Sequence, residues 1–211
     1  MELPDTITHY HSRSDRPFQN LSDLPPDALA EVLAALKRRK ARDPAFRRVF
    51  GGRYMEFRRR TEDKMRTLFE ARGGKPDRRS PHYFVLGDCP WFAGLYPDTG
   101  TVTLDWRSLP RAQASFTYPD SFVAMRLGPE YGLPPEPVQP YHDRVFFLDE
   151  LAEVVAAHGL PDGAADADYE GYHARRFETY IEVQVWADHP VAGIALSLIH
   201  ISEPTRLGMI S

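Results

Sequence analysis

The stretch Thr179-Tyr180-Ile181-Glu182-Val183-Gln184-Val185-Trp186 has the composition of a β-strand, because β-branched and aromatic residues dominate it. Successive side chains of a strand point to opposite faces of the sheet. Tyr180, Glu182 and Gln184 therefore share one face, and the apolar residues between them share the other. The pattern predicts a strand with one polar and one apolar face.

Further strands and helices are predicted around this stretch. A first helix has Leu29, Val32, Leu33 and Leu36 on one face, and a second, over residues 53–72, has an apolar stripe and ends at Gly73-Gly74. A short helix over 149–158 ends at Gly159. The other predicted strands are residues 6–11, 82–86, 101–104, 114–118 and 144–148. Early helices followed by strands indicate an α+β fold with a mostly antiparallel sheet and an early helical pair.

Length and composition indicate one α+β domain over residues 1–195, because domains usually hold about 100 to 200 residues. The apolar runs fall short of the roughly 20 residues that cross a bilayer, so no membrane partner is expected. The sequence has one cysteine, Cys89, which excludes an internal disulfide and favours a cytoplasmic location.

Residues 196–211 read as the translation of DNA from a transposase-type library adapter. The in-frame translation of such an adapter matches Leu196-Ser197-Leu198-Ile199-His200-Ile201-Ser202-Glu203-Pro204-Thr205-Arg206. Such segments are excluded from fold reasoning. We therefore expect a non-native tail, an assembled environmental read as the source, and a natural sequence that departs from this one after Ala195. A natural strand is the alternative.

Positive charge is concentrated in residues 37–79, predicted as a basic helical insertion within the domain. This segment holds 17 Lys or Arg and 6 Asp or Glu, a net charge of +11, whereas the chain carries −4, so the rest sums to −15. Clustered cations attract phosphates, and nucleic acid or an acidic protein is the expected partner. Solvated helix faces are the alternative. The candidate nucleic-acid-binding residues are Arg58, Arg59, Arg60, Lys64 and Arg66.

Three other positions have side chains that could perform chemistry. His9 and His11 point to the same face of a strand, as a metal pair requires, but no further ligand motif completes a site, so no metal is expected. Cys89 has no neighbouring base in the sequence, and a small buried filler is favoured over a nucleophile. Glu182 is either on a solvent-exposed face or on the floor of a cleft, where it could stabilise a cationic transition state.

The order of four features is informative. His9 and His11 lie on a first strand that precedes Asn20-Leu21-Ser22-Asp23-Leu24. An aromatic strand, Pro81-His82-Tyr83-Phe84, leads to the proline-containing turn Cys89-Pro90-Trp91-Phe92. Next come Phe116-Thr117-Tyr118-Pro119-Asp120 before a small helix, and finally Ile181-Glu182-Val183-Gln184-Val185 followed by Asp188.

Taken together, these features resemble the ADP-ribosyltransferase fold, most of all the DNA-targeting ADP-ribosyltransferase toxins. The resemblance implies NAD as the cofactor and Glu182 as the catalytic carboxylate. It implies that His9 or His11 contacts the ribose and that Tyr83 or Tyr118 packs on the ring. Those toxins have an arginine in the turn after the aromatic strand, where this chain has Gly87-Asp88-Cys89-Pro90. A fold relative with altered or lost activity therefore remains open.

The sequence is compatible with three functions. The first is an NAD-dependent ADP-ribosyltransferase-like enzyme. The second is a non-catalytic binding module that uses the basic helical face, and the third is a protein whose sheet cleft binds another small ligand. Convergence of Glu182 with His9 favours the first, and a convex basic surface favours the second.

Overall fold

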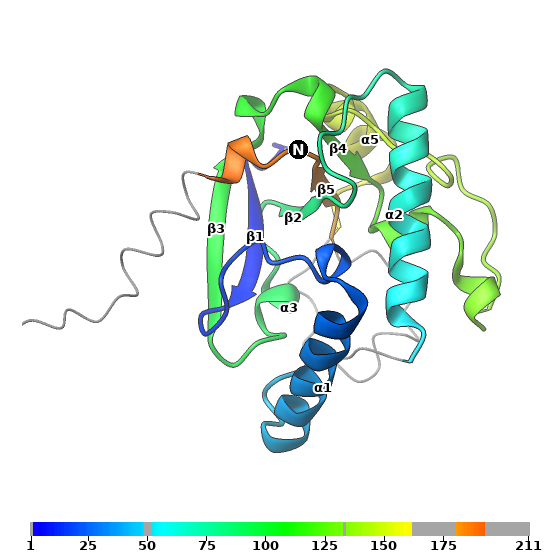
Figure 1. Cartoon of the computed structure of the whole chain (residues 1–211). Coiled ribbons are helices and arrows are strands. Elements are labelled where there is room, and N and C mark those ends of the chain that lie inside the picture. The colour runs from blue at the N-terminus through cyan, green and yellow to red at the C-terminus, as the bar shows by residue number, and fades with distance from the viewer. Residues whose placement is uncertain (1, 49–51, 133, 162–179, 193–211) are drawn as a thin grey trace, which may run out of the picture.

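The computed structural model describes residues 2–48, 52–132, 134–161 and 180–192. They form an α+β fold with an open five-stranded sheet of order β3-β1-β2-β5-β4, in which every neighbouring pair is antiparallel (Figure 1). The strands are β1 (Thr6–Ser12), β2 (His82–Leu86), β3 (Thr99–Asp105), β4 (Ala114–Thr117) and β5 (Glu182–Val185). The antiparallel sheet and the α+β class were both predicted.

The helices whose bounds lie within the described residues confirm the early helical pair, since the two long ones precede β2. They are α1 (Pro26–Arg42), α2 (Tyr54–Ala71), α3 (Pro90–Ala93), α4 (Ser121–Ala124) and α5 (Leu151–His158). Short 3-10 segments are η1 (Leu21–Asp23), η2 (Trp106–Ser108), η3 (Arg111–Gln113), η4 (Gly128–Tyr131) and η5 (Leu148–Glu150).

The two long helices begin and end where the sequence signals predict. Pro26 is the first residue of α1, where its missing N–H costs nothing, and the last turn of α1 is basic, which suits the helix dipole. Gly73, with φ of +93°, follows the C-cap of α2. Gly159 has the same φ at the C-cap of α5, a conformation that glycine adopts without strain.

Cross-strand register determines which residues share a face. Thr8 pairs with Val85, Val85 with Glu182, and Glu182 with Thr117, so these four residues lie on one face of the sheet. Residues one position along each strand point to the other face. His9 therefore points away from the Glu182 face.

Hydrophobic clusters cover both faces of the sheet. On the face opposite Glu182, Ile7, Phe84, Phe116 and Val183 pack with Leu151 of α5 in a large buried cluster. On the Glu182 face, the indole of Trp186 joins a second cluster. That cluster's α2 members are Met65 and Phe69, and the Phe69 ring stacks on Trp186 at 5.9 Å between centroids. The sheet is thus covered by α5 on one side and α2 on the other.

The strand predicted over residues 144–148 is wrong. Only Phe146 pairs there, through an isolated bridge to Phe116, and η5 begins at Leu148. The Phe147 N–H donates to the carboxylate of Glu150 at 2.7 Å. This local hydrogen bond competes with the cross-strand hydrogen bonds that a strand would need. A local side-chain hydrogen bond therefore turns the chain into α5.

No helix in the described parts of the chain has the length and apolar character that crossing a membrane requires. The predicted loop over 162–168 and the predicted adapter-coded tail at 196–211 lie outside the described residues.

Candidate functional site

Glu182 lies in β5 between β2 and β4, next to Val85 and Thr117. It is 9% exposed, and Gln184 on the same face is fully buried. The interpretation of this face as simply solvent-exposed is therefore wrong for β5. Glu182 and Glu62 are the two buried carboxylates among the described residues.

A chain of hydrogen bonds between polar side chains fixes the amide of Gln184, which lies beside Glu182. The Gln184 amide donates to Glu182 Oε1 and to Thr117 Oγ1, both at 3.1 Å. Its oxygen accepts from Ser115 Oγ at 2.9 Å, and Ser115 Oγ in turn accepts from Trp186 Nε1 at 2.8 Å. Since each member fixes the next, the Gln184 N–H that faces Glu182 has a fixed orientation.

Burial raises the pKa of the Glu182 carboxyl to about 7, and the nearby carboxylate of Asp120 adds to the rise. Hydrogen bonds from Ser121 and Gln184 and the charge of Arg58 oppose it. Asp120 caps α4, where it accepts from the N–H of Phe122 at 2.8 Å. Glu182 therefore changes charge near neutral pH, the range in which a general acid or base is most effective.

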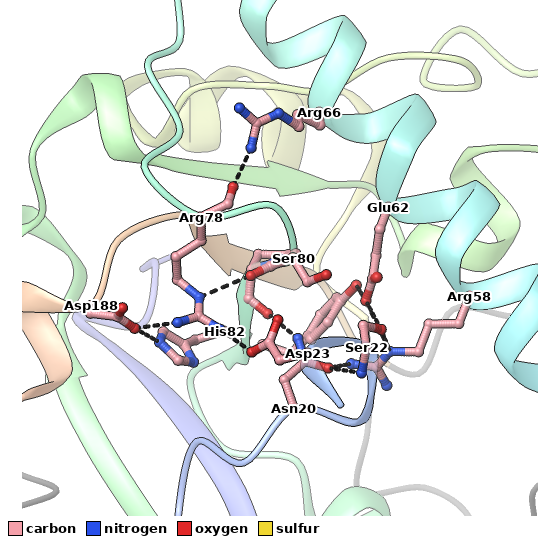
Figure 2. A network of polar contacts seen from close by, with 12 residues as sticks. Asn20, Ser22, Asp23, Arg58, Glu62, Arg66, Arg78, Ser80, His82 and Asp188 are labelled. Atoms are coloured by element: carbon pink, nitrogen blue, oxygen red, sulfur yellow. Dashed lines mark hydrogen bonds and ion pairs between the residues drawn. The ribbon is translucent and has the colours of Figure 1, made fainter. Parts of the chain in front are cut away.

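Tyr83 and Arg58 lie on the same side of the sheet as Glu182 and are joined through Glu62. Figure 2 shows the contact between Arg58 and Glu62. The Tyr83 hydroxyl and Arg58 Nε each donate to Glu62 Oε1 at 2.9 Å, and the Arg58 guanidinium lies 4.6 Å from the centre of the Tyr83 ring. Burial and the charge of Glu62 raise the pKa of Tyr83 well above its usual value. Tyr83 is thus a fixed, protonated aromatic side chain.

An aromatic wall stands near the same site. The Tyr180 ring stacks on Trp91 at 6.3 Å and meets Phe92 edge-on at 5.4 Å. Burial, followed by the charges of Asp120 and Glu182, raises the pKa of Tyr180 well above its usual value. The site therefore combines a titrating carboxyl with two neutral tyrosines.

The histidines of β1 are placed away from Glu182. His9 Nδ1 donates to the Tyr83 carbonyl at 2.8 Å, and its Nε2 accepts from the Phe18 N–H at 3.3 Å. Burial lowers the pKa of His9 to about 4, so it is a neutral ring that joins two strands and a loop. His11 Nδ1 donates to the Ser12 carbonyl at 2.8 Å.

Tyr118 also belongs to the opposite face. Its hydroxyl donates to the His158 carbonyl at 2.8 Å, and its ring packs on Tyr141 at 4.9 Å. Of the four residues that the resemblance assigns to NAD, the structure thus brings only Tyr83 to Glu182.

Four of the five candidate nucleic-acid-binding cations have partners within the chain. Arg58 is 14% exposed and pairs with Glu62. Arg60 pairs with Glu130 at 2.5 Å, Lys64 with Asp143 at 2.5 Å and Arg66 with Glu70 at 2.9 Å. Arg59 alone of the five has no ion pair with the described residues. Exposed cations without such a pair lie instead on α1, namely Lys37, Arg38, Lys40 and Arg42.

Burial raises the pKa of the Cys89 thiol to about 11, so it is not a ready nucleophile. In the described ranges, no three His, Cys, Asp or Glu side chains gather as a metal site would require.

Two sequence signals point to interactions that the prediction missed. Arg58 and Glu62 stand four apart on a helix, a spacing that favours an ion pair. Asp120 directly precedes a short helix, as an N-cap does. Comparison of the chain with family models, curated proteins and solved structures gives no match.

Proposed function

We propose that this protein is an NAD-using, ADP-ribosyltransferase-like enzyme whose reaction depends on Glu182. The observation that carries the proposal is a buried carboxyl with a pKa of about 7 that forms no ion pair with the described residues. Buried carboxyls usually have such a partner, as Glu62 has in Arg58. A perturbed carboxyl without a structural pair marks a candidate reaction centre.

The chemistry of ADP-ribosyl transfer fits these residues. The bond between ribose C1′ and the nicotinamide nitrogen breaks, and nicotinamide leaves with the bonding electrons. An acceptor oxygen or nitrogen then bonds to C1′ and loses its proton. Ionised Glu182 would stabilise the positive charge on the ribose, and its pKa near 7 also suits it to take up the acceptor's proton.

Tyr83 and Tyr180 would supply aromatic surfaces for the substrate. Arg58, from α2, places a cation close enough to lower the pKa of Glu182. It could take the place of the arginine that the ADP-ribosyltransferase toxins have in the turn after the aromatic strand. His9, His11 and Tyr118 face the other side of the sheet, so the expected convergence of Glu182 with His9 is absent. The proposal therefore assigns these three residues no contact with NAD and rests on Glu182 itself.

The test is NAD consumption and label transfer by the wild type and by Glu182→Gln, with single- and double-stranded DNA, RNA and protein as acceptors. Loss of one preorganised charged group should lower turnover by about a hundredfold or more. The matched control is Glu153→Gln, since Glu153 is exposed on α5, and it should leave turnover unchanged. A wild type that neither binds NAD in calorimetry nor consumes it with any acceptor would overturn the proposal.

A second candidate function is a binding module for nucleic acid or an acidic protein, favoured by the exposed cations of α1. Replacing Lys37, Arg38, Lys40 and Arg42 with glutamine should weaken binding to DNA and reduce its salt dependence. The matched control replaces Arg60, Lys64 and Arg66, whose charges are paired within the chain. Equal loss in both variants would show that no particular face binds.

A further inference from the structure

A cavity of about 280 Å³ lies between the segment that leads into α1 and the middle of α2. Its lining includes Ser22, Arg59, Glu62, Asp63, Arg79 and Ser80, but not Glu182. Pockets for drug-sized ligands begin at roughly 300 Å³. This cavity therefore admits a group smaller than a dinucleotide.

Glu62 lines this cavity from α2, and its carboxylate points toward Ser22 (Figure 2). Its side chain is buried, yet Ser22, Arg58 and Tyr83 all donate to the same atom, Oε1, at distances from 2.9 to 3.0 Å. The other oxygen, Oε2, receives no hydrogen bond from the described residues. Oε2 retains some solvent exposure, so it is reachable from the cavity and can accept a hydrogen bond from a ligand hydroxyl.

Two arginines give the same cavity a positive side. Arg59 is half-buried and, within the part of the chain that the structure describes, makes neither a hydrogen bond nor an ion pair. Arg79 is 78% exposed, and its contact is a long one, 3.6 Å to Asp63. A guanidinium group can donate two parallel hydrogen bonds to two oxygens of one phosphate. A phosphate at this place could draw Arg79 away from Asp63.

We propose that this cavity binds a pentose phosphate unit, with the phosphate between Arg59 and Arg79 and a sugar hydroxyl donating to Glu62 Oε2. Ser80, itself buried, adds a hydroxyl group to the lining. A sugar phosphate makes both kinds of contact, whereas inorganic phosphate makes only the contacts with Arg59 and Arg79. Binding here does not depend on NAD use or on Glu182. The unit could be a free sugar phosphate, a nucleotide or part of a nucleic acid.

The test is calorimetric titration of the full chain with ribose 5-phosphate, alongside ribose and inorganic phosphate. Ribose 5-phosphate should bind more tightly than either part. Arg59→Gln and Arg79→Gln should each weaken its binding by about tenfold to a hundredfold, the usual effect of losing a charged hydrogen bond. The matched control is Arg60→Gln, one position along α2 and paired with Glu130, which should bind like the wild type.

Two further titrations identify the source of the unit. Tighter binding of AMP than of ribose 5-phosphate supports a nucleotide, and still tighter binding of a short oligonucleotide supports a nucleic-acid backbone. Three results overturn the proposal: no binding of ribose 5-phosphate up to about 10 mM, equal affinity for inorganic phosphate, or equal weakening in Arg60→Gln. None of these measurements uses turnover, so the two proposals fail separately.

Discussion

Glu182→Gln should change how the stability of the protein depends on pH. The pKa of Glu182 is raised by burial from 4.5 to about 7. Between these values the folded chain holds a proton that the unfolded chain has released, so the wild-type free energy of unfolding falls as pH rises. The span is about 2.5 pH units at about 1.4 kcal/mol per unit, or about 3 to 4 kcal/mol in total.

Glutamine has the shape of the protonated carboxyl and does not titrate. At pH 4.5 the variant and the wild type should therefore have similar free energies of unfolding, and by pH 8 the variant should be more stable by about 3 to 4 kcal/mol. Urea unfolding of both proteins across this range measures the difference directly. Taking the difference cancels every other titrating group that the two share.

Exposed Glu153 provides the control, because Glu153→Gln should shift stability by a small amount that does not vary with pH. A gap between Glu182→Gln and the wild type that stays constant from pH 4.5 to 8 would contradict a raised pKa for Glu182. It would mean that Glu182 is as well solvated or as well paired in the folded chain as in the unfolded chain.

Four other outcomes are expected. Turnover of NAD should rise with pH around a midpoint of about 7 if ionised Glu182 is the active form, and a rate that falls across this midpoint contradicts that role. In the wild type, the free energy of unfolding should fall by about 3 kcal/mol as pH falls from 6.5 to about 4, because His9 is neutral when folded and takes up a proton on unfolding. His9→Asn should abolish this part of the fall, and an unchanged pH dependence between 6.5 and 4 in urea unfolding contradicts the prediction. Arg58→Met should cost about 3 to 5 kcal/mol, because it leaves Glu62 buried without its cation, and a cost below about 1 kcal/mol in urea unfolding contradicts this. Deleting residues 196–211 should change Tm by less than about 2 to 4 °C, and a larger drop in a thermal melt would mean that the tail contributes to folding.

Much of the fold could be predicted from the sequence, because local patterns determine it. Alternation and composition located the strands of the sheet, and helical periodicity located α1, α2 and α5, with glycine stops for α2 and α5. The prediction failed at residues 144–148, where aromatic and β-branched residues favour a strand. There the carboxylate of Glu150 binds the Phe147 N–H, a single interaction that strand composition does not reveal.

The site could be predicted only in part, because its assembly depends on register between distant strands. Alternation within one strand correctly grouped Glu182 with Gln184. It could not tell whether His9 or Thr8 faces the same way as Glu182, since that depends on the pairing of Thr8 with Val85 and of Val85 with Glu182. A shift of one residue in either pairing would reverse the answer. The same limit applies to Tyr118, which the resemblance assigns to NAD. Because Thr117 pairs with Glu182, the next residue, Tyr118, points to the opposite face.

The cations of residues 37–79 fall into two groups that differ in their ion pairs, and each group relates to a different candidate function. On α2 the charges are largely satisfied by Glu62, Glu130, Asp143 and Glu70, so this helix supports the fold and brings Arg58 to the Glu182 site. The second half of α1 instead presents exposed cations that lack ion pairs with the described residues. A phosphate binds an unpaired cation more favourably than a cation that must first leave a close internal partner. Substitutions on α1 should therefore affect binding of a polyanion without affecting Glu182, and substitutions at Glu182 should affect chemistry without affecting that binding.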